Sequence, residues 1–387
     1  GSNNTSMGKD ALLVNTTGTD NTAVGFNSLD ANTTGTLNTA VGRFSLSANT
    51  TGGKNVAIGG NSLFSNTEGE FNTAVGYNCL DANTTADNNT AVGYHALILN
   101  TTGTQNVAVG SQALDANTTA RFNTAVGHLA LSANTTAEAN TGIGRTSLFA
   151  NTTGASNTGC GCATLENNTT GGQNNAFGHH ALDANTTGSS NCGFGVHALG
   201  ANTTASNNSA FGAAALLSNT TGNENTAVGA NAHDSNTTGS FNVAIGLSAM
   251  GLATTAGDSV SVGRGSLQAL TTGSNNTGVG KDVGQSLTTG GSNVLVGRRA
   301  GSSITTASNN ICIGTAAGLG HISTSGDQLF IARSNTGSGN AATFIYGNSS
   351  GSLFQGSNSS SWSTTSDQRL KKDIVTNTVG LSIIDNI

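Results

Sequence analysis

One pattern of apolar, small and polar positions recurs along most of the chain with a period of 17 residues. In residues 21–37, NTAVGFNSLDANTTGTL, the fifth position is a glycine, with an apolar residue before it and a leucine four residues after it. The residue before the glycine is apolar in every repeat, and the leucine column runs from Leu12 to Leu216 before His233 and Met250 interrupt it. The glycine recurs without an insertion at Gly8, Gly25, Gly42, Gly59, Gly76, Gly93, Gly110, Gly127, Gly144, Gly161, Gly178, Gly195, Gly212, Gly229, Gly246, Gly263, Gly280, Gly297 and Gly314.

Within NTAVG the apolar and small residues alternate, which is the period of a strand. We expect each unit to hold two short strands and two turns, and to bury its large side chains by stacking on copies of itself. The sequence therefore predicts an all-β fold, a parallel β-solenoid (β-roll) of 17-residue rungs over residues 1–318. At about 4.8 Å per rung, it is a rod roughly 90 Å long.

The apolar column before the glycine and the leucine column are expected to form the core, as Val24 and Leu29 do in the template. Ala23 and Gly25 would then present a nearly flat strip on the opposite face, suited to close packing against another chain. Because a thin β-rod has a small core, we expect it to be stabilised by association as a homotrimer. Glycine or alanine after each NTT segment, as at Gly35, indicates a tight corner with positive φ or a close backbone approach.

Composition narrows the functional classes. The chain has 387 residues with 55 glycines, no proline, 8% charged residues and a net charge of −6. Collagen is excluded because glycine does not recur every third residue, and few aromatic residues argue against a globular enzyme of this length. No apolar run approaches the roughly 18 residues of a membrane helix. We expect no cofactor, no nucleic-acid partner and no membrane insertion.

Residues 4–318 resemble the left-handed parallel β-roll of trimeric autotransporter adhesin heads, whose units carry a comparable Asn-small-x-Ala-Ile-Gly strand. The NTAVG and NVAIG segments carry this resemblance, although the 17-residue period is longer than the usual unit. It implies a left-handed coil, a trimer and an adhesive role.

After Gly314 the register decays. Residues 319–362 are rich in serine and glycine, with strand-like pieces at Leu329–Ala332 and Thr343–Tyr346, and we expect a β cap or neck there. Residues 363–387 are different, because basic and acidic residues cluster in WSTTSDQRLKKDI.

This last segment resembles the start of the endosialidase-type intramolecular chaperone at the C-terminus of phage tail spikes and fibres. The family motif is Ser-Asp-x-Arg-Leu-Lys followed by isoleucine; the residues that fit are Ser366, Asp367, Arg369, Leu370, Lys371 and Ile374. The resemblance implies a domain, truncated here, that promotes trimerisation and then cuts itself off between Ser366 and Asp367. Ser366 would be the nucleophile and Lys371 its activating base, a role that a desolvated lysine can fill.

Other patterns suggest alternatives. The Asn-Thr-Thr column suggests ice binding, but adjacent threonines cannot both point outward, so a stacked ladder of Asn15 through Asn236 is favoured. His180 and His197 share one column on consecutive rungs and are weak candidates for a metal site.

Acidic residues and cysteines fall into columns too. Asp30, Asp81, Asp115 and Asp183 share a position on separate rungs, without the paired carboxylates or loops of a polysaccharide-cleaving enzyme. Four cysteines replace small or apolar residues of the repeat and are interpreted as core or ladder residues, whereas Cys162 occupies a variable position; the four are Cys79, Cys160, Cys192 and Cys312.

These patterns favour a structural and adhesive protein: the shaft of a phage tail fibre or spike, part of a virion and extracellular. Its expected partners are two further copies of itself and a host receptor, either a glycan or a surface protein. The alternatives are a trimeric autotransporter adhesin head on a bacterial surface and, third, an ice-binding β-solenoid.

Overall fold

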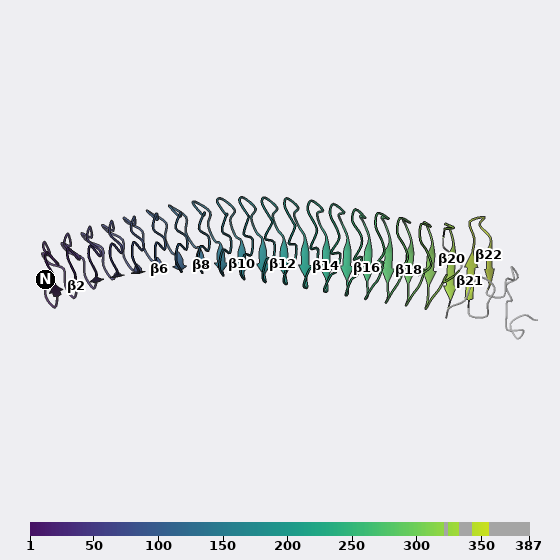
Figure 1. Ribbon diagram of the computed structural model, residues 1–387, viewed down its shortest axis with the longest axis horizontal. Coiled ribbons are helices and arrows are strands. Elements are labelled where there is room, and N and C mark those ends of the chain that lie inside the picture. The colour runs from purple at the N-terminus through teal and green to yellow at the C-terminus, as the bar shows by residue number, and fades with distance from the viewer. Residues whose placement is uncertain (321–323, 333–342, 356–387) are drawn as a thin grey trace, which may run out of the picture.

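The computed structural model describes residues 1–320, 324–332 and 343–355, which form a long, thin and gently curved rod (Figure 1). The described residues form 22 strands in a single sheet, in which each strand pairs with the next along the chain. The strands are β1 Thr5–Met7, β2 Thr22–Val24, β3 Thr39–Val41, β4 Val56–Ile58, β5 Thr73–Val75, β6 Thr90–Val92, β7 Val107–Val109, β8 Thr124–Val126, β9 Thr141–Ile143, β10 Thr158–Cys160, β11 Asn175–Phe177, β12 Cys192–Phe194, β13 Ser209–Phe211, β14 Thr226–Val228, β15 Val243–Ile245, β16 Val260–Val262, β17 Thr277–Val279, β18 Val294–Val296, β19 Ile311–Ile313, β20 Leu329–Ala332, β21 Thr343–Gly347 and β22 Leu353–Gln355.

The pairing confirms the parallel β-solenoid with 17-residue rungs. In β2 and β3, Thr22 lies opposite Thr39 and Ala23 opposite Ala40, an offset of one repeat. The same parallel register continues to β19, and β20 then joins in parallel with one extra residue between the rungs.

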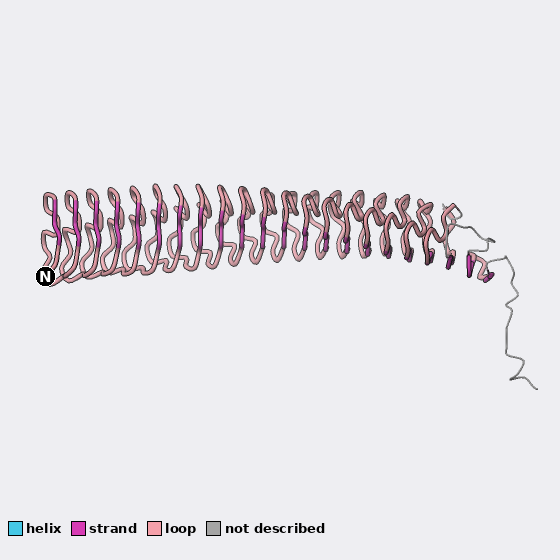
Figure 2. Tube along the Cα trace, turned by 90° about the horizontal axis from the view of Figure 1, so that it is seen from below, coloured by secondary structure: helices cyan, strands magenta, loops and turns pink. Residues whose placement is uncertain are grey.

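Each rung holds one short strand, so the expectation of two strands per rung is wrong. The strand is three residues long, and turns form the rest of the rung (Figure 2). The physical reason is a set of positive φ angles that interrupt the extended backbone: 139° at Gly25, 51° at Asn27, 52° at Leu29 and 60° at Leu37.

The expected core is half correct. Leu29 is fully buried as predicted, but Ala23 is buried with it while Val24 points outward and is only partly buried. Strand alternation places Ala23 on one face and both Thr22 and Val24 on the other. The interior of a rung is narrow, and alanine is the residue that fits opposite the leucine column.

Two columns of buried asparagines run beside this core. The predicted ladder from Asn15 to Asn236 is confirmed, because each side-chain amide donates to the carbonyl oxygen of the asparagine one rung before, as Asn32 does to Asn15 at 2.8 Å. A second ladder, which was not predicted from the sequence, is formed by the asparagines that stand immediately before the strands. There Asn38 accepts a bond from the backbone N–H of Asn55 at 3.0 Å and donates to the corner carbonyl of Gly52 at 2.9 Å.

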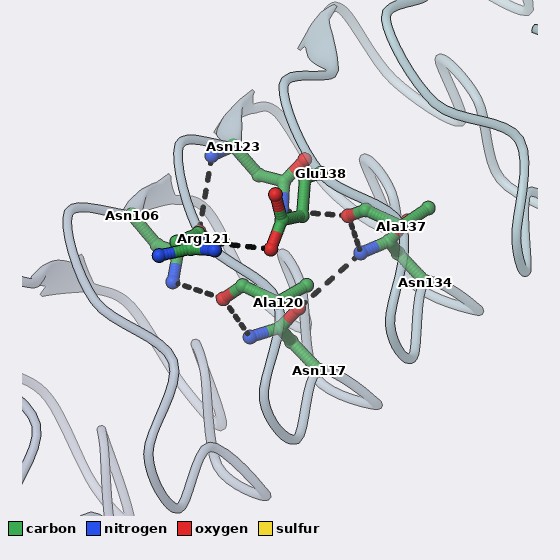
Figure 3. Close-up of polar contacts among 8 residues, drawn as sticks. All are labelled: Asn106, Asn117, Ala120, Arg121, Asn123, Asn134, Ala137 and Glu138. Atoms are coloured by element: carbon green, nitrogen blue, oxygen red, sulfur yellow. Dashed lines mark hydrogen bonds and ion pairs between the residues drawn. The ribbon is translucent and has the colours of Figure 1, made fainter.

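The two ladders meet at the corner after each NTT segment (Figure 3). The carbonyl oxygen of Ala120 accepts amide bonds from Asn106 at 2.8 Å and from Asn117 at 3.2 Å. A Cβ built on the equivalent Gly35 would press against the Asn32 side chain and the next rung's backbone, so alanine, as at Ala120, is the largest residue that this corner carries up to Ala307. Close approach, and not positive φ, therefore explains the small corner residues, since Gly35 is absent from the positive-φ residues.

Towards the C-terminal rungs the residues of the core change, but the core remains fully packed. Leu287 and Ile304 replace asparagine in the first ladder, and glycine replaces leucine at Gly284 and Gly301. A Cβ at Gly284 would lie 2.8 Å from the Leu295 side chain, so no space remains for a leucine there.

Antiparallel strands end the described rod. The predicted segment Leu329–Ala332 is β20, and the segment predicted from Thr343 is β21, which extends to Gly347. β20, β21 and β22 pair antiparallel, and the ring of Tyr346 packs between Phe330 at 5.2 Å and Phe354 at 5.5 Å.

Candidate interaction surfaces

The outward side chains at the first and third positions of β1–β19 form a continuous surface, which we call the strand face. The third position is apolar in all nineteen strands, from Met7 and Val24 to Ile313. The first position is threonine in many strands and valine or isoleucine in others, such as Val260 and Ile311. Side chains at both positions are partly exposed, for example 41% for Ile58 and 36% for Val260.

The strand face replaces the strip expected from the sequence. Ala23 is completely buried, so it cannot contact another chain. Thr22 and Val24, on the other side of the strand, are the partly exposed residues instead. Figure 2 shows the strands that carry this surface turning gradually about the long axis of the rod.

Three phenylalanines form an aromatic ladder on the strand face. Phe177, Phe194 and Phe211 occupy the third position of β11, β12 and β13. Their rings stack with centroids 4.5 and 5.1 Å apart and planes within 11° of parallel. Stacking covers the ring faces, so the ring edges form the apolar surface that remains for a partner.

The paired threonines after each asparagine are largely structural. The hydroxyl of Thr33 donates to the carbonyl oxygen of Thr50 at 3.0 Å, and Thr50 donates to Thr67 at 3.1 Å. The following threonine, such as Thr34, is exposed. This confirms that only one threonine of each pair points outward, with the other bonded within the rod.

The two histidines considered for a metal site lie together. The rings of His180 and His197 stack at 5.3 Å, and Nδ1 of His180 is 3.0 Å from a carboxylate oxygen of Asp183. Across the described ranges, no group of three or more His, Cys, Asp or Glu side chains is arranged to hold a metal ion.

The aspartate column is bonded along the rod. Ser47 and Ser132 donate to the carboxylates of Asp30 and Asp115, both at 2.6 Å. Burial raises the pKa of Asp81, with His95 opposing the shift. These carboxylates have hydroxyl or histidine neighbours on adjacent rungs, which is not the arrangement of a glycosidase acid pair.

The cysteines divide between the interior and the surface. Cys79 and Cys312 are fully buried, and burial raises the pKa of their thiols to about 11 and about 12. Cys160 and Cys192 lie on the strand face and are partly exposed, as is Cys162 in the turn after β10. The interpretation as core or ladder residues is therefore correct for Cys79 and Cys312, which lie in the core. Cys160 and Cys192 lie outside the core, and Cys192 accepts an amide bond from Asn175 on the rung before, as a ladder residue does.

The residues of the self-cleavage motif, Ser366, Asp367, Arg369, Leu370, Lys371 and Ile374, lie outside the described residues.

Neither the fold nor a relative assigns a role to these surfaces. In the part of the chain that the structure describes, no helix could cross a membrane. Comparison of the chain with protein-family models, with curated proteins and with solved structures finds no match.

Proposed function

We propose that the chain is the receptor-binding shaft of a phage tail fibre or spike, in which three copies of a left-handed β-solenoid pack through their strand faces. The observation that carries the proposal is the uninterrupted apolar column of the strand face, on described rungs that run from Gly8 to Gly314 without an inserted loop that could form a catalytic cleft. A solitary rod would leave this column in water, whereas assembly removes it from water.

The dimensions of the strand face suit an interface. A face one strand wide and nineteen rungs long measures about 10 by 90 Å, which gives roughly the 800 Å² that each partner contributes to a standard interface. The aromatic ladder of Phe177, Phe194 and Phe211 supplies a central apolar anchor, because large aromatic side chains dominate interface energetics.

The C-terminal motif supports the choice of a tail fibre over an adhesin head. Ser366 to Ile374 resembles the chaperone that trimerises phage fibres, and the same resemblance assigns cleavage to Ser366 with Lys371 as base. In a chain carrying the whole chaperone domain, we expect Ser366→Ala to abolish processing while leaving the trimer intact. Normal processing of that variant, seen as a band of cleaved size, would refute the assignment.

The native mass tests the assembly. Light scattering on the purified chain should give three times the 38.1 kDa of one copy. The mass of a monomer would contradict the shaft, because the strand face would then be exposed in solution.

Ice binding is the second candidate, and one structural observation favours it. The strand face places Thr22 and Val24 outward around a buried Ala23, and repeats them in register without insertion. The ladder of stacked phenylalanines interrupts the flatness that such a face requires. Thermal hysteresis of ice growth by a monomeric rod would favour this second function.

A further inference from the structure

Basic side chains gather near the C-terminal end of the rod, at the position after each strand-ending glycine. Arg264, Lys281 and Arg298 occupy this position on three consecutive rungs, and Arg299 follows directly. All four are exposed. Asp282 is the one acidic residue between positions 260 and 320, in a chain whose net charge is −6. This part of the rod is therefore locally positive.

Four of the other basic side chains of the rod lie over aromatic rings, whereas Arg145 stands alone on its rung: Lys9 lies over Phe26, Arg43 over Phe44, Lys54 over Phe71 and Arg121 over Phe122. In the basic group, Lys281 is 3.9 Å from the carboxylate of Asp282. Within the described ranges, Arg264, Arg298 and Arg299 contact neither a ring nor a carboxylate in this way. Their guanidinium groups remain available to an anionic ligand.

A pocket of about 220 Å³ lies beside Arg264. Gly265 lines it, at a position where the neighbouring rungs carry Ser248 and Asp282. A Cβ at Gly265 would lie 2.9 Å from Oδ1 of Asp282 and 3.5 Å from Oε1 of Gln268, so a side chain added here would press against the polar groups that line the pocket. Leu247 and Gln285 also line this pocket, together with Arg264, Gly265, Gln268 and Asp282. We call it the Arg264 pocket.

We propose that the Arg264 pocket binds one sugar unit of an acidic polysaccharide, with the sugar carboxylate held by Arg264. Arginine pairs with carboxylates through two parallel hydrogen bonds. The side chains of Gln268, Asp282 and Gln285 supply the donors and acceptors that sugar hydroxyls require, and Leu247 offers an apolar surface to the ring. The inference rests on the proposed receptor-binding role and names the class of receptor.

A polymer fits this surface better than a single sugar. Arg298 lies two rungs beyond Arg264, about 10 Å away, so carboxylates farther along one glycan chain meet a second available guanidinium group. The pocket residues belong to the turns after β15, β16 and β17, not to the strand face. Packing through the strand face therefore leaves the pocket open, and a trimer presents three pockets to one polymer.

The test measures binding of polygalacturonate, a linear polymer of an acidic sugar, by titration calorimetry. Gly265→Asn places in the pocket a residue that the repeat uses at the same position and positive φ, as at Asn231, and the Asp282 carboxylate, the end of a flexible side chain, shifts to admit the new Cβ. Arg264→Gln removes the pocket charge, and Arg145→Gln removes an exposed arginine from the same column seven rungs away. We expect Gly265→Asn and Arg264→Gln each to weaken binding by roughly tenfold or more, and Arg145→Gln to have no effect.

Polymers of other chemistry test the ligand class. Neutral dextran should not bind, and poly-L-glutamate should bind more weakly than polygalacturonate. Three results would overturn the proposal: absence of polygalacturonate binding, unchanged binding by Gly265→Asn, or equal affinity for poly-L-glutamate. The native mass of the same samples separates this inference from the shaft. A threefold mass without binding overturns the pocket alone, and a monomer that binds contradicts the shaft alone.

Discussion

Leu29 and its equivalents fill the core from a left-handed backbone, with φ at 52° for Leu29. The sequence predicts that this column is buried, because leucine recurs there almost without exception. It does not predict the backbone, since leucine disfavours positive φ. Nor does it decide between Ala23 and Val24 as the inward residue, because alternation defines two faces without saying which one is buried.

His233 replaces leucine in this column and leads to a prediction about pH. It is fully buried, and burial lowers its pKa from 6.5 to about 4, an effect opposed by a 3.4 Å contact with the carbonyl of Met250. The unfolded chain binds this proton near pH 6.5 and the folded chain only near pH 4. Falling pH therefore removes stability in this window, by about 1.4 kcal/mol per pH unit.

Replacing His233 with the leucine of the repeat should remove this loss. Urea unfolding between pH 7 and 4.5 should show a smaller fall of the midpoint in His233→Leu than in the natural chain, with His128→Gln as the exposed-histidine control. An equal fall in all three proteins would show that His233 is not the acid-sensitive group.

At the scale of the rung, the asparagine ladders replace a second strand as the connection between neighbours. The Asn15–Asn236 ladder is predictable because asparagine stacks at a fixed position in a turn. The second ladder, which includes Asn106 and Asn123, has an equally regular signal in the asparagine before each strand. The sequence does not reveal that these asparagines join the rungs, because their side-chain hydrogen bonds run from one rung to the corner of the next.

Asn117 provides the test of a ladder. Its amide donates to Asn100 at 2.8 Å and to Ala120 at 3.2 Å, and its side-chain oxygen accepts from Asn134 at 3.2 Å. Asn117→Ala leaves buried polar groups without these partners and should destabilise the rod by roughly 2–4 kcal/mol. Urea unfolding measures the change. Thr119→Ala, on the exposed side of the same turn, is the matched control, and an equally small effect of both substitutions would contradict the ladder.

At the scale of the molecule, the repeat is enough to predict a parallel solenoid, because only stacking buries the leucine column. The strand face and the Arg264 pocket are harder to predict. The strand face depends on which of the two alternating sets of strand residues points into the core. The Arg264 pocket depends on the side chains that surround Gly265 in three dimensions.

A charge on the strand face should prevent assembly. Phe194 lies at the centre of the aromatic ladder, and Phe194→Asp would bury a carboxylate in each copy of the interface, so the native mass should fall to that of one chain. Phe241→Asp makes the same change at an exposed corner where Glu224 and Asp258 occur naturally on adjacent rungs. Assembly of the Phe194→Asp protein at the mass of the natural chain would exclude the ladder from the interface.

The natural cysteines test the central claim, which is that the strand face joins copies of the chain. Cys160 and Cys192 lie on that face, while Cys162 lies two residues beyond Cys160 in the turn, and all three are partly exposed in a single copy. The measurement is the alkylation rate of each thiol in the native protein, resolved by peptide mass spectrometry. The account predicts that Cys160 and Cys192 react much more slowly than Cys162 until urea separates the copies. Reaction of Cys160 as fast as Cys162 in the native protein would contradict it.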